Sequence, residues 1–423
     1  MTSLRPLPLR RPAAQRDGWL LRHLKPRLLD RLDALEGGRL LLIDGDTRHR
    51  LGRGGDLNVT VVLHRQRAWR RLALGGTVGA AEAYMDGDWE TDDLVALTRL
   101  FARNIAHVNA RVETGSARLA KLALRGFHAL RRNTRRGARR NIQAHYDLGN
   151  ELFALFLDRE HRMYSSALFP TADADLETAS TCKLDHLLDK LDVRAEHHLL
   201  EIGTGWGGLA IHAARTRGCR VTTTTLSDEQ YADVAARIAA AGLEDRITLL
   251  RQDYRELQGR FDRLVSVEMI EAVGHQYLPA YLATLDRLLT DDGLAALQAI
   301  TIRDQRYTAA RREADFIKRY IFPGGFLPSH TAILEAMTRH STLNLIDLEE
   351  IGPHYARTLG EWRRRFEARL DTVRRLGYDE RFIRLWRYYL SYCEGGFRER
   401  TIGTCQLLLA KPGARPAPRT GTP

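Results

Sequence analysis

From residue 196 to residue 302, short apolar blocks alternate with longer amphipathic blocks, and this pattern predicts strands separated by helices. The connections are short, which favours a mostly parallel, doubly wound α/β sheet that binds ligands beyond the carboxyl ends of its strands. Strands are expected over 197–203, 220–226, 246–250, 261–267 and 293–302, with helices over 208–216, 228–241 and 277–289. Two later apolar segments, 343–351 and 405–410, are expected to complete the sheet.

The first third of the chain has a mixed pattern that predicts a small N-terminal α+β domain over 17–130. Segments typical of amphipathic helices occur at 19–35 and 94–130, and a strand-like segment, LNVTVVLH, occurs at 57–64. The arginine-rich stretch 131–140 is interpreted as a linker to the α/β domain, which spans 141–411. The basic leader 1–16 and the tail 412–423 are rich in Pro, Gly and Arg, so both are expected to be disordered.

The segment LLEIGTGWGGLA, residues 199–210, predicts a buried strand that ends in a glycine turn and continues as a helix. Glu201 stands two residues before the first glycine, and Gly203 and Gly205 allow the backbone to approach a ligand closely. Together with Gly208 they have the GxGxxG spacing of dinucleotide sites. The motif therefore indicates a nucleoside cofactor without separating NAD from S-adenosylmethionine. An ordinary glycine-rich turn is the alternative interpretation.

Composition narrows the class of protein. The net charge of +12 favours contact with nucleic acid or anionic lipid, although the arginine cluster within 131–140 could also be a solvated linker. No apolar run reaches the roughly 18 residues that a membrane-spanning helix needs. The N-terminus lacks the features of a signal peptide. The four cysteines lack CxxC spacing, so we expect a cytoplasmic protein without a metal site.

Four further segments narrow the function. They are NIQAHYDLGNELFALFLDREHRMYSSALF at 141–169, FDRLVSVEMIEAVG at 261–274, DFIKRYIFPGGFLPS at 315–329 and YLSYCEGGFRER at 389–400. With the glycine turn, they resemble the cyclopropane fatty acid synthase family, which includes the mycolic acid cyclopropane synthases. The resemblance covers about 140–411, and 17–130 is similar to the N-terminal domain of the phospholipid-acting members. It implies a seven-stranded class I methyltransferase sheet with helical lid insertions, and a homodimer.

This resemblance implies that S-adenosylmethionine donates one carbon to the double bond of unsaturated acyl chains in membrane phospholipids. The resulting carbocation must be shielded from water, stabilised by aromatic faces and deprotonated to give a cyclopropane. Alternatively, a hydride shift precedes proton loss and gives a methylene branch, which a flavin- or nicotinamide-dependent oxidoreductase partner would reduce. Either enzyme would work at the inner face of the membrane.

The resemblance also assigns cofactor contacts, to Tyr164, Ser165, Gly203, Gly205, Thr225, Gln230 and Tyr254. The pattern itself adds Glu201 before the turn, and it adds Asp253 after the third strand, where an adenine amino group could find an acceptor. Asp228 stands 25 positions after Gly203, so its spacing alone would allow an acid that binds the NAD ribose. The remaining motifs favour S-adenosylmethionine.

By the same resemblance, Glu271 matches an acid that helps to bind a bicarbonate ion, which is thought to accept the proton. Tyr355 and Ile300 match other positions around that ion. Two departures alter the expected anion site. Ser166 stands where the family has a cysteine, and Gln298 stands where it has a histidine. Both replacements can still donate hydrogen bonds, so the site either survives with altered affinity or is lost.

A third departure introduces a new carboxylate. Glu268 stands where the family often has glycine, and Ala272 replaces a histidine. We hypothesise that Glu268 replaces the bound anion as the base, the alternative being a structural acid paired with an arginine.

Cys393 matches a cysteine long treated as an active-site residue, but alkene methylation has no covalent enzyme step, so we interpret it as a buried residue beside the acyl channel. The segment IFPGGFLPSH, 321–330, is either a mobile apolar lid or a static turn. A nucleic-acid-binding protein or RNA methyltransferase is a second functional class, but the arginine cluster lacks interleaved aromatic residues. An inactive lipid-binding relative is a third.

Overall fold

The structure is a computed structural model that describes residues 19–105, 149–313 and 315–416. The chain divides into two units. The first comprises Met1–Ala129, Glu313–Ile321 and Trp362–Thr401, and the second comprises Leu130–Arg312, Phe322–Glu361 and Ile402–Pro423. Two segments of the first unit thus come from the stretch that sequence analysis assigned to the α/β domain. The predicted leader and the arginine-rich linker lie outside the described residues.

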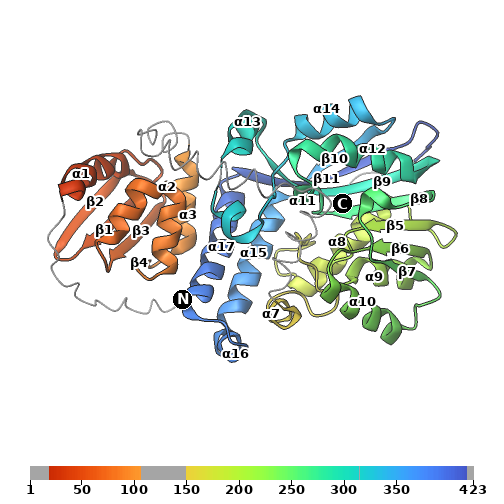
Figure 1. The fold of residues 1–423 in the computed structure, drawn as a ribbon, viewed down its shortest axis with the longest axis horizontal. Coiled ribbons are helices and arrows are strands. Elements are labelled where there is room, and N and C mark those ends of the chain that lie inside the picture. The colour runs from red at the N-terminus through yellow and green to blue at the C-terminus, as the bar shows by residue number, and fades with distance from the viewer. Residues whose placement is uncertain (1–18, 106–148, 314, 417–423) are drawn as a thin grey trace. The chain divides into compact units, whose positions relative to one another are not determined.

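The first unit is built on a four-stranded sheet of order β2-β1-β3-β4 (Figure 1). β1 pairs antiparallel with β2 and parallel with β3, and it buries Leu40 and Leu42 on one face. The strands are β1 Gly38–Asp44, β2 Thr47–Gly54, β3 Leu57–Leu63 and β4 Trp89–Thr91. The helices are α1 Trp19–Asp33, α2 Arg67–Met85, α3 Leu94–Arg103, α16 Leu370–Arg375 and α17 Glu380–Arg398, with a π-helical turn at Ile317–Ile321.

The second unit contains the predicted seven-stranded sheet, in the order β10-β11-β9-β8-β5-β6-β7. β5 to β9 run parallel, and β11 is antiparallel to both of its neighbours. The strands are β5 His198–Ile202, β6 Arg220–Thr224, β7 Ile247–Leu250, β8 Phe261–Val267, β9 Leu289–Ile302, β10 Asn344–Glu350 and β11 Ile402–Ala410. The doubly wound fold class is confirmed.

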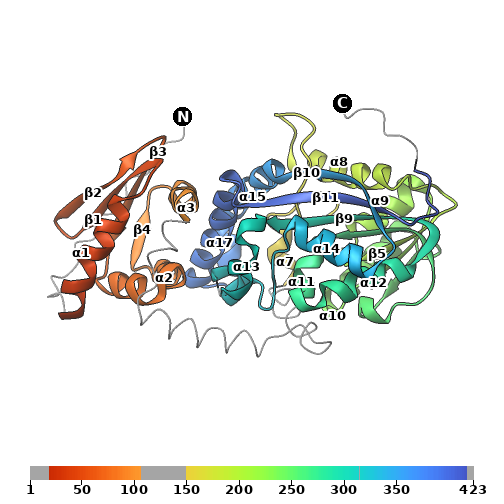
Figure 2. The ribbon, with the colours of Figure 1, turned by 90° about the horizontal axis from the view of Figure 1, so that it is seen from above.

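Helices cover both faces of this sheet (Figures 1 and 2). Because β5 is buried on both sides, Leu199 packs into one hydrophobic core and Leu200 into the other. On the Leu199 side lie α8 Leu176–Lys190, α9 Gly208–Arg217 and α10 Asp228–Ala241. On the Leu200 side lie α11 Ile270–Val273, α12 Leu278–Leu288 and α14 His330–His340. The remaining helices are α7 Asn150–Ala154, α13 Asp304–Arg312 and α15 Gly352–Glu367, which crosses from the second unit into the first.

Within the described part of the chain, no helix combines the length and the apolar character required to cross a bilayer.

Candidate functional site

The glycine turn after β5 has the backbone that its sequence predicts. Gly203 (φ 97°), Gly205 (φ 53°) and Gly207 (φ 78°) all adopt left-handed conformations, which side chains disfavour. The N–H groups of Gly203 and Thr204 both donate to the Thr224 carbonyl, at 3.2 and 3.0 Å. The turn is thereby fastened to the end of β6 and leads directly into α9.

Thr225 follows β6 and donates through Oγ1 to Oε1 of Gln230 (2.8 Å), so the amide nitrogen of Gln230 is directed elsewhere. That Nε2 is buried without a hydrogen-bond partner among the described residues, as is Oγ1 of Thr204. Buried polar atoms without partners are costly, and the hydroxyl groups and ring nitrogens of a nucleoside would satisfy both. The residues after β5 and β6 therefore fit an adenosine-containing cofactor.

Glu201 and Asp253, two acids assigned to the cofactor, both have partners within the protein. Oε2 of Glu201 accepts a hydrogen bond from Oγ1 of Thr223 (2.6 Å), and burial raises the pKa of Glu201 to about 8. The Asp253 carboxylate accepts from Nε and Nη2 of Arg255, at 2.8 and 2.6 Å. The predicted adenine contact of Asp253 would have to be shared with this ion pair.

Tyr254, the aromatic residue assigned to the cofactor, is buried after β7. Its ring packs edge-on against Tyr281 with centroids 5.4 Å apart, and burial raises the pKa of Tyr254 to about 12. Packing accounts for this ring, and its cofactor contact remains a prediction.

The segment Tyr164–Ser166 follows a loop that Asp158 organises. The Asp158 carboxylate accepts from the N–H groups of His161 (2.6 Å), Arg162 (3.1 Å) and Met163 (2.8 Å). Arg162 takes a left-handed φ of 51° in this loop. A buried carboxylate that satisfies three successive N–H groups holds the following residues in one conformation.

Tyr164 belongs to an aromatic cluster that sequence reasoning missed. Its ring centroid lies 5.0 Å from that of Phe153 and 6.5 Å from that of Phe322. Phe153 in turn lies 4.9 Å from Trp206 of the glycine turn. Aromatic faces attract cations, so this wall suits a cofactor that carries a sulfonium. The sequence feature that could have revealed this cluster is the pair Phe153 and Phe156, which stand three residues apart and precede YSSA at 164–167.

Lys183 on α8 is a second residue that sequence reasoning missed. Its side chain is fully buried, and Nζ donates to Oγ of Ser165 at 2.9 Å. Burial lowers the pKa of Lys183 to about 8, although the charges of Glu268, Asp158 and Glu201 act in the opposite direction. The sequence feature that could have drawn attention to Lys183 is the rarity of lysine, because only six of the 65 basic residues are lysines.

The carboxylate of Glu268 is held by three hydrogen-bond donors. Oε1 accepts from the Ser166 backbone N–H (2.9 Å) and from Nε2 of Gln298 (2.8 Å), and Oε2 accepts from the Tyr355 hydroxyl (2.7 Å). Gln298 is itself oriented by Nε2 of Gln406 (3.0 Å). Three residues assigned by resemblance to an anion site therefore converge on this side chain.

The backbone at Glu268 adopts a left-handed conformation that is rare for a residue with a side chain. Its φ is 50°, a conformation that costs a non-glycine residue about 1 kcal/mol, and its N–H donates to the Gln298 carbonyl at 2.7 Å. Ser166 contributes only its backbone, because its hydroxyl donates to the Ala167 carbonyl (3.0 Å). No arginine forms an ion pair with Glu268 in the described part of the chain.

Glu271 lies beside Glu268 but has fewer donors. Its Oε1 accepts from the N–H of Ile300, and its buried Oε2 has no partner among the described residues. Burial, reinforced by the Glu268 charge, raises the pKa of Glu271 to about 8. Burial also raises the pKa of Glu268, but three hydrogen bonds and Lys183 oppose that shift. The proximity of the two carboxyl groups disfavours ionisation of both at once, and Glu268 has more donors that stabilise its charged form.

The segment expected to be a lid or a turn is hydrogen-bonded to this site. The N–H of Phe326 donates to the Glu271 carbonyl (3.0 Å), and the Pro328 carbonyl accepts from the N–H of Ile302 (2.9 Å). Phe326 is buried in the sheet core.

Cys393 belongs to α17 in the first unit, whereas the other candidate residues belong to the second. Burial raises the pKa of its thiol, which disfavours a thiolate nucleophile.

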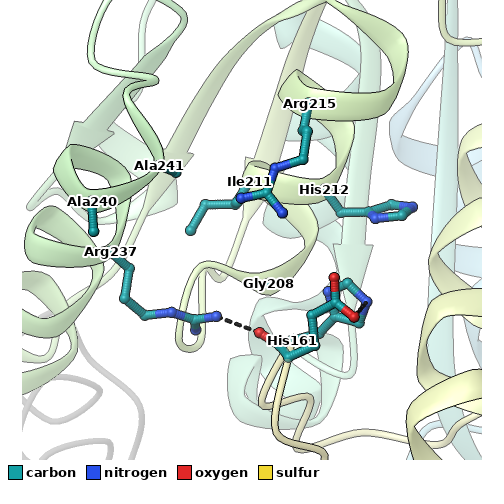
Figure 3. A pocket seen from close by; sticks show the side chains of 9 residues that line it. His161, Gly208, Ile211, His212, Arg215, Arg237, Ala240 and Ala241 are labelled. Carbon is teal, nitrogen blue, oxygen red and sulfur yellow. Dashed lines mark hydrogen bonds and ion pairs between the residues drawn. The ribbon is translucent and has the colours of Figure 1, made fainter.

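A cavity of about 210 Å³ lies between α9, α10 and the loop before Tyr164 (Figure 3). Gly208, His161 and Arg237 are among its lining residues, and Nη2 of Arg237 donates to the Glu160 carbonyl at 2.6 Å. Apart from Gly208 of the GxGxxG motif, none of its described lining residues was assigned to cofactor binding or catalysis. We therefore place the candidate site at the strand ends.

The strand order and the glycine turn are those of the class I methyltransferase fold, and the unpartnered polar atoms fit an adenosine-containing cofactor. Residues 133–407 match the family model for mycolic acid cyclopropane synthetase, and the chain belongs to that family of enzymes, which act on unsaturated lipid chains.

Three relatives illustrate the range of the family. The chain is 41% identical over 373 residues to tuberculostearic acid methyltransferase UfaA1 of Mycobacterium tuberculosis, covering 84% of each protein. It is 34% identical to the cyclopropane-fatty-acyl-phospholipid synthase of Escherichia coli K12, covering 81% of this chain and 85% of that enzyme. The solved mycolic acid cyclopropane synthase CmaA1, complexed with SAH and CTAB, superimposes with a TM-score of 0.60 at 31% identity, covering 64% of this chain and 98% of that one.

Proposed function

We propose that this enzyme methylates the double bond of unsaturated acyl chains in membrane phospholipids, and that Glu268 is the base. S-adenosylmethionine supplies an electrophilic methyl group when bound. The supporting observation is that the Glu268 carboxylate accepts from Ser166, Gln298 and Tyr355, the groups expected around a bicarbonate ion. With those donors engaged, the reaction needs no bound bicarbonate.

We further propose that the product is a methylene-branched chain rather than a cyclopropane. Both products require loss of a proton from the added methyl group, but the methylene product requires a hydride shift first. The three hydrogen bonds make Glu268 a weaker base than the same buried carboxylate would be without donors, which gives the cation time to rearrange. The 41% identity to a relative named as a tuberculostearic acid methyltransferase, and not as a cyclopropane synthase, supports this proposal. A separate flavin- or nicotinamide-dependent reductase would then form the methyl branch.

Proton NMR of lipids from the purified enzyme, S-adenosylmethionine and dioleoyl phosphatidylglycerol vesicles tests the product. We expect signals of an exocyclic methylene in the vinyl region. Upfield cyclopropane ring signals as the main product would refute this assignment, and unaltered oleoyl chains would refute the proposed activity.

Substitution of Glu268 tests the base. Glu268→Gln keeps the shape and removes the proton acceptor, so turnover should fall at least a hundredfold, a typical effect of losing a general base. Glu268→Gly tolerates the left-handed backbone and vacates the three donors. Its activity should therefore be low and should rise with added bicarbonate, whereas the wild type should not respond. Near-normal turnover of Glu268→Gln without bicarbonate would refute the role of Glu268.

A further inference from the structure

The contact between Lys183 and Ser165 determines how the serine hydroxyl can be used. An ammonium group carries only hydrogen-bond donors, so at 2.9 Å the Ser165 Oγ must be the acceptor. The hydroxyl hydrogen of Ser165 is then left for another acceptor. Ser165 is itself 4% exposed, and it has no further hydrogen-bond partner among the residues that the structure describes.

The neighbours of Ser165 place this hydroxyl within the candidate site. Tyr164 belongs to the aromatic cluster around the glycine turn, and the N–H of Ser166 holds Glu268. A buried hydroxyl hydrogen without an acceptor costs free energy, so a ligand that brings an acceptor is favoured here. A hydroxyl backed by an ammonium group is best suited to an anionic acceptor.

S-adenosylmethionine has one anionic group, the carboxylate of its methionyl end. We propose that Lys183 is a positioning residue that fixes the Ser165 hydroxyl as a donor to this carboxylate, an inference that rests on the cofactor of the proposed function. Lys183 thereby acts on cofactor affinity through Ser165 and not on the proton transfer at Glu268.

The choice of lysine supports a specific role. The chain has only six lysines among 65 basic residues, and two of them, Lys183 and Lys190, are buried on α8. Lys190 pairs with Asp347 (2.6 Å) and Glu349 (2.7 Å) of β10, so its buried charge is satisfied by carboxylates. No carboxylate lies within ion-pair distance of Lys183 in the described ranges, and its hydrogen-bond partner is the neutral hydroxyl of Ser165. A single ammonium can approach a hydroxyl where a planar guanidinium would need more space.

Calorimetric titration of the full chain with S-adenosylmethionine and with decarboxylated S-adenosylmethionine tests this proposal. Lys183→Met and Ser165→Ala should each weaken binding of S-adenosylmethionine by roughly tenfold to a hundredfold, as expected for a hydrogen bond to a charged group. Binding of the analogue that lacks the carboxylate should change less than about threefold, because the group that Ser165 recognises is absent. Lys190→Met is the matched control and should leave the ratio of the two affinities unchanged.

The proposal would be overturned if Lys183→Met and Ser165→Ala weakened the binding of both ligands equally, or if both variants left the ratio of the two affinities unchanged. Ser165→Ala keeps the test decisive if Lys183→Met does not fold. A variant that loses turnover while keeping the affinity ratio would also overturn it, because Lys183 would then serve Glu268. Failure of the wild type to modify unsaturated phospholipid would refute the proposed function and leave the affinity ratio intact.

Discussion

At the scale of single residues, the number of hydrogen-bond donors separates acids that are otherwise alike. Glu268 has three donors to its side chain, whereas Glu201 has one, from Thr223. Both are surrounded by protein, which penalises a negative charge. The three donors to Glu268 therefore stabilise its charged form more than the single donor stabilises that of Glu201.

Glu201 should make stability depend on pH. Its pKa is about 8 in the folded chain against an ordinary value of 4.5, so the folded state binds this proton more tightly than the unfolded state. Between those values, stability should fall as pH rises, by at most about 1.4 kcal/mol per pH unit for one group. Glu201→Gln cannot ionise and should lose this contribution. Urea unfolding of both proteins at pH 5, 6.5 and 8 without ligand should show that the unfolding free energy of Glu201→Gln depends less on pH than that of the wild type. The same pH dependence in both proteins would contradict the argument.

At the scale of elements, close backbone approaches position the site. Gly208 begins α9 next to His161 (Figure 3). A Cβ built on Gly208 would lie 2.2 Å from the His161 carbonyl oxygen. The helix and the loop before Tyr164 are therefore in contact at a point where only glycine fits.

Gly208→Ala should separate α9 from this loop. We expect a loss of about 1–3 kcal/mol in unfolding free energy, as for other overpacked sites, together with weaker binding of S-adenosylmethionine. Gly242→Ala, at the end of α10, is the control, because a Cβ there has no atom within 4 Å. Alanine is strained at the left-handed φ of 63° that Gly242 adopts, so the control variant should be less stable than the wild type. Its affinity for the cofactor should nevertheless be retained. Equal cofactor affinity in the two variants would contradict the role of this contact.

The helices and strands of the second unit were largely predictable, because each has a clear apolar pattern. The helix expected over 228–241 matches α10, and the strand expected over 261–267 matches β8. In the first unit, β2 was missed because TRHRLGRG has a single apolar side chain, Leu51, and lies at the sheet edge. The helix α2 was missed because it contains a glycine pair, with non-helical angles at Gly76.

At the scale of the whole molecule, the net charge of +12 and the lipid-modifying family favour work at an anionic membrane surface. The full chain should co-sediment with phosphatidylglycerol vesicles more than with neutral phosphatidylcholine vesicles. Raising the salt from about 0.05 M to about 0.5 M should reduce that binding, since the Debye length shrinks severalfold. Equal binding to both vesicle types would contradict an electrostatic attraction.

The sequence alone was sufficient for the doubly wound sheet, the glycine turn and the family, because these depend on local periodicity and on contiguous motifs. It also raised Glu268 as a base, but it could not separate that role from a structural ion pair. Tertiary structure decided the question of partners, since Ser166, Gln298 and Tyr355 come from segments far apart in the chain and meet only in the fold. The pairing of Lys183 with Ser165 was hidden for the same reason, because no local pattern records which buried donor faces which acceptor.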